Sequence, residues 1–134
     1  MIPSCRQEID ALHVFFQKWL NGALPGGREG LQRVREALAD DFVIISPDAR
    51  RTGKKSLLRG LLSANGNWNG GRIWIEHLEG RQLSDELALM MYEEWQQTGD
   101  DVRARLSSAI FRKAEGAPEG VEWVHLHEVW MPRG

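Results

Sequence analysis

Three consecutive stretches near the C-terminus decide the fold: residues 86–97 (ELALMMYEEWQQ), 102–113 (VRARLSSAIFRK) and 122–131 (EWVHLHEVWM). Each alternates between apolar and polar residues with a period of two, which is typical of a β-strand. The connectors between them are rich in Gly, Asp and Pro, the residues that favour hairpin turns. Together with a fourth alternating stretch, residues 72–83, they predict a meander of four long antiparallel strands.

Helical spacing characterises the first part of the chain. Apolar residues recur at helical intervals from Ile9 to Leu20, and Ser4 with Gln7 fits a capping box at the start of this helix. Three short elements are predicted next: a helix over residues 31–39, a strand over 42–46 and a helix over 57–62. Helices followed by consecutive hairpins indicate an α+β fold with helices on one face of a mostly antiparallel sheet. We expect this strongly curved sheet to wrap around the long N-terminal helix as a conical barrel.

Length, composition and charge limit the possible classes. The 134 residues fit a single domain, 1–134, and 42% hydrophobic with 27% charged residues is an ordinary globular balance. Seventeen Lys+Arg against nineteen Asp+Glu leaves no basic excess for nucleic acid. The longest apolar run, residues 87–92, is far below the ~20 residues of a membrane span. With one cysteine, Cys5, and no visible targeting segment, we expect a cytoplasmic protein without membrane partners.

Several local strings resemble a known superfamily. They are residues 39–44 with 46–48 (ADDFVI and SPD), 92–96 (YEEWQ), 107–112 (SSAIFR) and 123–127 (WVHLH). The chain resembles the nuclear-transport-factor-2-like (cystatin-like) superfamily, and within it the SnoaL-like and domain-of-unknown-function 4440 branch, over roughly Gln7 to Met131. The resemblance implies a conical α+β barrel, often a homodimer through the outer sheet face, with a pocket between the long helix and the concave face. Its members include isomerases, cyclases, dehydratases and non-catalytic association domains.

Strand parity divides the last strand into two faces, and the sequence does not decide which one lines the pocket. Glu128 shares one face with Val124 and Leu126, whereas His127 shares the other with Trp123. Both faces mix apolar and polar groups, as expected if the outer face forms a dimer.

The candidate catalytic residues are Tyr92, Glu94, His127 and Glu128. Burial in an apolar cone raises the pKa of a carboxyl group, so a glutamate there could act as general acid or base near neutral pH. In this hypothesis Tyr92 hydrogen-bonds a developing oxyanion while Glu94, Glu128 or His127 moves a proton. The alternative is structural: the strand glutamates form cross-strand pairs with arginines. The arginines available for this are Arg103, Arg105 and Arg112.

Aromatic residues, six tryptophans among them, suggest an apolar ligand pocket or simply a packed core. The candidate ligand-binding residues are Phe16, Trp19, Trp68, Trp95, Arg105 and Phe111. Trp68 differs from the others because it lies in a Gly/Asn-rich loop, where it could cover the mouth of the cone or contact a partner subunit.

The sequence therefore supports a protein that binds a small hydrophobic or aromatic molecule, with metal-independent isomerase-, cyclase- or dehydratase-like chemistry as an option. The alternative is a non-catalytic homodimeric scaffold or regulatory module. His125 and His127 could hold a metal with His77, because alternate strand residues lie ~7 Å apart. No Cys cluster or carboxylate triad supports that site, so we predict neither metal nor cofactor.

Overall fold

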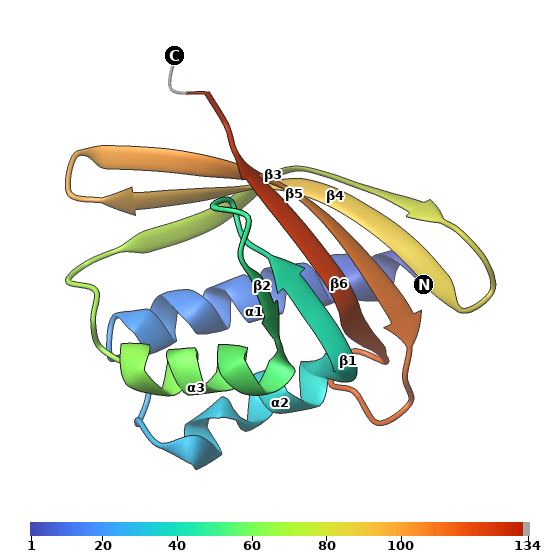
Figure 1. Cartoon of the computed structure of the whole chain (residues 1–134), viewed down its shortest axis with the longest axis horizontal. Helices are drawn as coiled ribbons and strands as arrows, with labels where there is room; N and C mark the ends of the chain where they lie inside the picture. The colour runs from blue at the N-terminus through green and yellow to red at the C-terminus, as the bar shows by residue number, and fades with distance from the viewer. Residues whose placement is uncertain (133–134) are drawn as a thin grey trace.

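A six-stranded sheet curves around the N-terminal helix in the computed structural model of the chain, which describes residues 1–132 (Figure 1). The elements in chain order are α1 (Ile2–Leu20), the 3-10 helix η1 (Arg28–Leu31), α2 (Gln32–Ala37), β1 (Leu38–Ile45), β2 (Arg51–Gly53), α3 (Lys54–Ala64), β3 (Arg72–Gln82), β4 (Leu87–Thr98), β5 (Asp101–Lys113) and β6 (Val121–Trp130). This arrangement confirms the predicted α+β cone with one long and two shorter helices.

The strand order is β2-β1-β6-β5-β4-β3. Strands β3 to β6 form the predicted antiparallel meander, and β1 adds to β6 in parallel. The sequence did not predict the short β2, which pairs with the end of β1. The long hairpins supply most of the wall of the cone.

A register shift between β5 and β6 overturns one prediction about the faces. Ile110 pairs with His125, but the next residue, Phe111, pairs with Trp123, so β6 has one extra residue at this point. Trp123 consequently lies on the concave face, with its ring 4.5 Å from that of Phe111 and 1% exposed. The predicted common face for Trp123 and His127 is wrong, because strict alternation does not survive a bulge.

Helix α1 crosses the concave face of the sheet, and its buried residues include Ile9, Leu12 and Trp19. The helix begins at Ile2, and Met1 caps it without a side-chain hydrogen bond. The predicted capping box at Ser4 is therefore wrong. Proline in the first turn explains the earlier start, because its fixed φ suits a helix and its missing N–H is not needed there. No helix within residues 1–132 is long and apolar enough to cross a membrane.

Glu8 is a fully buried carboxylate that ties three elements together at one end of α1. Its two oxygens accept hydrogen bonds from Arg33 of α2 at 2.8 and 3.2 Å, and the Trp123 indole N–H of β6 donates to one of them at 2.9 Å. Both oxygens are thus satisfied, which is the condition for burying a charge. We call Glu8, Arg33 and Trp123 the Glu8 cluster.

Candidate functional site

The strand register collects polar side chains on the concave face. Tyr92 and Glu94 of β4 lie opposite Ser107 and Arg105 of β5, and Ser107 lies opposite Glu128 of β6. Tyr92, Glu94, Ser107 and Glu128 are buried. Three neighbouring strands thus bring ionisable groups and hydroxyls together under α1.

His13 of α1 completes this group from the opposite side. Its Nε2 lies 2.8 Å from a Glu94 oxygen, and its Nδ1 lies 2.7 Å from the Ile9 carbonyl oxygen. Both neighbours are acceptors when Glu94 is ionised, so a doubly protonated imidazolium donates to both. Phe16 and Tyr92 pack edge-on against the imidazole ring, with centroids 5.9 and 5.7 Å away.

Arg105 links the two buried glutamates. Its Nη1 donates to Glu128 at 2.9 Å, and the Ser107 hydroxyl donates to the other Glu128 oxygen at 3.2 Å. The Arg105 Nε lies 4.0 Å from Glu94, too far for a hydrogen bond. The Glu128 pairing confirms the cross-strand alternative for that residue. We call His13, Tyr92, Glu94, Arg105, Ser107 and Glu128 the cone network.

The two glutamates have opposite electrostatic environments. Burial favours protonation of Glu94, but the hydrogen bond and charge of His13 outweigh it and lower the pKa of Glu94 to about 2. At Glu128, burial and then the negative charge of Glu94 raise the pKa above its ordinary value of 4.5, against the opposing effect of Arg105. Two carboxyl groups whose pKa values are pushed apart are suited to different roles in proton transfer.

The pKa values of two further groups of the cone network, His13 and Tyr92, are both raised. Burial opposes the charge on His13, yet the hydrogen bond and charge of Glu94 prevail and raise the pKa of His13 above 6.5. Burial, followed by the charges of Glu128 and Glu94, raises the pKa of Tyr92 well above 10. Tyr92 is therefore a neutral hydrogen-bond donor.

Two buried donors of the cone network make no hydrogen bond of ordinary geometry among residues 1–132: the Tyr92 hydroxyl, which interacts with Ser107, and the Arg105 Nε, which lies 4.0 Å from Glu94. An unpaired buried donor costs about 1–3 kcal/mol, so such groups are rare in folded proteins and often mark a site that a ligand or water completes. Trp130 lies beside Arg105 and is 39% exposed, with the guanidinium groups of Arg103 and Arg105 3.9 and 5.0 Å from its ring centroid.

The structure brings together only some of the predicted site residues. Tyr92, Glu94, Glu128 and Arg105 meet in the cone network, with Phe16 against His13. His127 is exposed and pairs with Ser108 and Ile45, on the face opposite Glu128. The structure thus places Glu128 on the concave face and His127 on the outer face, a choice that the sequence left open.

The remaining predicted ligand-binding residues lie away from the cone network. Trp19 and Phe111 are fully buried, and the Trp19 indole donates to the Leu61 carbonyl at 2.7 Å. Trp95 lies on the outer face, stacked on Trp74 with centroids 6.0 Å apart. The Trp68 ring lies against Gly71, where a β-carbon would come within 2.0 Å of it.

The histidines considered for a metal are dispersed. His77 of β3 is exposed and pairs with Glu93 at 3.0 Å, whereas His125 and His127 lie on β6. Within residues 1–132, no group of three His, Cys, Asp or Glu side chains could hold a metal ion.

Sequence reasoning missed His13 and Trp130. His13 was hidden in an apolar helix face, four residues after Ile9 and three before Phe16. A histidine at a buried helical position requires a polar partner, and this is the signal that could have revealed it. Trp130 could have been found from its parity, which it shares with Glu128 beyond the bulge.

A family match accounts for nearly the whole chain. Residues 5–132 match the family described as "Sucrose-6-phosphate phosphohydrolase C-terminal". The chain belongs to this family. Two curated relatives are the "Probable sucrose-phosphatase 2" and "Probable sucrose-phosphatase 1" of Arabidopsis thaliana, 19% identical over 125 residues and 20% identical over 129 residues. Each alignment covers 92% of this chain but only 29% of the relative's own length.

Solved structures place this member of the sucrose-6-phosphate phosphohydrolase C-terminal family in the NTF2-like fold. An NTF2-like protein of unknown function, PA1314 from Pseudomonas aeruginosa, is 26% identical with a TM-score of 0.85, covering 96% of this chain and 99% of that one. The Caenorhabditis elegans CaMKII association domain is 14% identical with a TM-score of 0.67, covering 95% and 96%. The superfamily prediction is confirmed at this level, and the SnoaL-like branch stays a prediction.

Proposed function

We propose that the chain is a small-molecule-binding domain whose ligand places an acceptor oxygen between the Arg105 Nε and the Tyr92 hydroxyl. The observation that carries this proposal is the burial of both donors without a hydrogen bond of ordinary geometry among residues 1–132. A carbonyl or carboxylate oxygen would satisfy both. Trp130 and Phe16 supply apolar and aromatic surface beside them, which suits the hydrophobic or aromatic ligand that the sequence predicts.

Acid–base chemistry at Glu128 is the finer part of the proposal. Glu128 has a raised pKa, so it can exchange a proton with a bound ligand, whereas Glu94 stays ionised in its pair with His13. Neutral Tyr92 and cationic Arg105 would stabilise negative charge that develops on the ligand oxygen. This proton transfer is of the kind that isomerases, cyclases and dehydratases use, and it draws on side chains alone.

A fragment screen followed by NMR tests the binding proposal. The probes are benzoate and acetophenone, which carry an acceptor oxygen, and ethylbenzene, which has none. We expect benzoate and acetophenone to shift amide signals of β4, β5 and β6. Tyr92→Phe should lower the affinity for both probes about fivefold, which corresponds to the loss of one hydrogen bond of ~1 kcal/mol. Arg105→Lys keeps the charge but loses the Nε donor, and it should lower the affinity for both probes by a similar factor.

Two outcomes would contradict the proposal. One is the absence of shifts with any probe at millimolar concentration. The other is equal binding of benzoate to wild type, Tyr92→Phe and Arg105→Lys, which would show that the unpaired donors are not used. Arg81→Lys, on exposed β3, is the matched control for the arginine change.

A second candidate function, self-assembly through the outer face of the sheet, rests on a different observation. Leu106 of β5 and Val129 of β6 are direct cross-strand neighbours and are 48% and 47% exposed. With the Trp74–Trp95 stack they give this face an apolar character that a second copy would cover. Several proteins of the same fold are association or hub domains of CaMKII or its relatives, which agrees with such a role.

Sedimentation velocity tests the assembly proposal. We expect the wild type to sediment as a dimer at micromolar concentration and Leu106→Glu to sediment as a monomer. Leu83→Glu is a matched control, because Leu83 is also 48% exposed but lies between β3 and β4. A monomeric wild type, or dissociation by both substitutions alike, would refute assembly through this face.

A further inference from the structure

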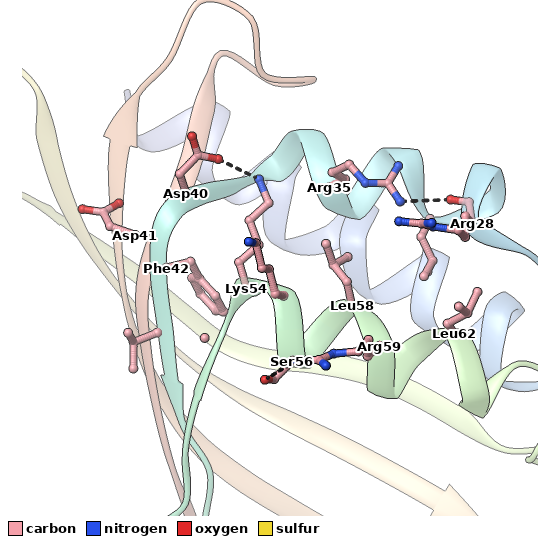
Figure 2. A pocket seen from close by; sticks show the side chains of 14 residues that line it. Arg28, Arg35, Asp40, Asp41, Phe42, Lys54, Ser56, Leu58, Arg59 and Leu62 are labelled. Carbon is pink, nitrogen blue, oxygen red and sulfur yellow. Dashed lines mark hydrogen bonds and ion pairs between the residues drawn. The ribbon is translucent and has the colours of Figure 1, made fainter.

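A groove between α2, β1 and α3 is separate from the cone network. It is an open hollow of about 1180 Å³ and shares no lining residue with that network (Figure 2). Its walls come from η1 and α2 on one side, from α3 on the other and from the start of β1 at one end. Neither part of the proposed function uses this groove.

The side chains around the groove carry an excess of positive charge. Five cationic side chains line it: Arg28, Arg35, Lys54, Lys55 and Arg59. Only Lys54 has an ion pair within residues 1–132, with Asp40 at 3.3 Å. The second carboxylate of the groove, Asp41, is engaged by Arg112 at 3.3 Å. Four cations without a carboxylate partner around one hollow, in a chain of net charge −2, create a local positive potential that attracts anions.

The floor of the groove is apolar. Leu31 and Phe42 line it and are 1% and 2% exposed, and Leu58 and Leu62 of α3 also face the hollow (Figure 2). Arg35 is oriented by its hydrogen bond to the Arg28 carbonyl at 3.1 Å, so its guanidinium lies at the rim. A cationic rim over an apolar floor suits a ligand with an anionic end and a compact organic body.

We propose that this groove binds a small organic phosphate monoester. A phosphate monoester carries close to two negative charges at pH 7 and offers three acceptor oxygens, which matches several cations better than a single carboxylate does. Guanidinium groups bind phosphate oxygens in a bidentate manner, and Arg28, Arg35 and Arg59 are available for this. The organic body lies on the leucine and phenylalanine floor.

NMR titration with three probes tests the proposal: phenyl phosphate, inorganic phosphate and phenol. We expect phenyl phosphate to shift amides of α2, α3 and the start of β1, and to bind about tenfold more tightly than inorganic phosphate or phenol. The double variant Arg35→Gln/Arg59→Gln should weaken phenyl phosphate at least tenfold, as expected for loss of two charge-assisted contacts. The control Lys18→Gln/Arg81→Gln removes two exposed charges elsewhere and should change the affinity less than twofold.

Three results would overturn the proposal. Shifts spread over surface cations throughout the protein would indicate only a general attraction of anions. Equal weakening by the two double variants would show that the groove cations have no special role. Affinities for inorganic phosphate or phenol equal to that for phenyl phosphate would eliminate the two-part recognition. A circular dichroism spectrum and urea midpoint like those of the wild type would show that each variant is folded.

Discussion

The Glu8 cluster and the cone network are both built around buried glutamates under the same helix, yet they differ in hydrogen bonding. In the Glu8 cluster, Arg33 and Trp123 satisfy both carboxylate oxygens. In the cone network, the Tyr92 hydroxyl and the Arg105 Nε make no hydrogen bond of ordinary geometry among the described residues. The Glu8 cluster is therefore a fully hydrogen-bonded buried charge that joins three elements, whereas the cone network retains two donors without a hydrogen bond.

Under the proposed function, this difference assigns stability to the Glu8 cluster and ligand binding to the cone network. A buried carboxylate whose two oxygens are both hydrogen-bonded has no free oxygen for a ligand, and its removal leaves its former partners buried without an acceptor. A network with unpaired donors lowers the stability of the free protein, and a ligand that satisfies them recovers this free energy. Substitutions in the two regions should therefore differ in their effects on stability.

The largest effect is expected for Glu8→Ala. This substitution leaves the buried Trp123 N–H and the guanidinium of Arg33 without their acceptor, and should lower the free energy of unfolding by about 3–5 kcal/mol. Urea unfolding measures it. Glu36→Ala, on the exposed side of α2, is the control and should change stability by less than about 0.5 kcal/mol. A small loss for Glu8→Ala would show that the cluster is not a structural tie.

An intermediate effect with a pH signature is expected for the His13–Glu94 pair. Glu94 has its pKa lowered from 4.5 to about 2, so its contribution to stability is present above pH 4.5 and is lost as the pH falls toward about 2. His13 has its pKa raised above 6.5, so its contribution is present below pH 6.5 and is lost as the pH rises through the raised value. The pair therefore stabilises most between about pH 4.5 and 6.5.

Glu94→Gln should remove about 2 kcal/mol inside this window and less on either side. Urea unfolding of wild type and variant at a series of pH values measures the difference. Taking the difference cancels the contribution of Glu8, whose raised pKa acts in the opposite sense on the acid side. Glu128 does not cancel in this way, because the charge of Glu94 is one cause of its raised pKa and the substitution removes that charge. A difference that does not vary with pH would contradict an ionised pair.

The smallest effect on stability is expected for Tyr92→Phe. Because the Tyr92 hydroxyl makes no hydrogen bond of ordinary geometry among the described residues, its removal should leave stability within about 1 kcal/mol of the wild type, on the stabilising side. Trp123→Phe removes a paired donor and should cost more, about 2 kcal/mol. Thermal unfolding of the two variants compares the regions directly, and an equal cost for both would remove the distinction between them.

Much of the fold could be predicted because the strands differ clearly from the helices in period. Alternation predicted β3 to β6 to within a residue or two at each end, and helical spacing predicted α1. The capping box failed because Ser4 is inside a helix that a proline allows to begin earlier. Short elements such as β2 depend on pairing with β1, and a three-residue segment carries no periodic signal of its own.

The candidate site could be predicted only in part. Tyr92, Glu94, Arg105 and Glu128 were chosen from parity and chemistry, and the register places them together. Their partner His13 comes from a helix far away in the sequence, and no spacing rule connects it to Glu94. The cluster of cations around the groove could not be predicted from the sequence either, because its members come from separate elements that only the tertiary fold brings together.

The extra residue in β6 between Trp123 and His125 also constrains how this family can vary. Before this extra residue the odd-numbered residues of β6 point inward, and after it the even-numbered residues do. A deletion of that extra residue would restore strict alternation, and Trp123 and Glu128 would both still point inward, four positions apart instead of five. Homologous chains that lack the extra residue should therefore carry the inward acidic group four rather than five positions after the inward tryptophan, and alignments without a gap there will equate residues on opposite faces of the sheet.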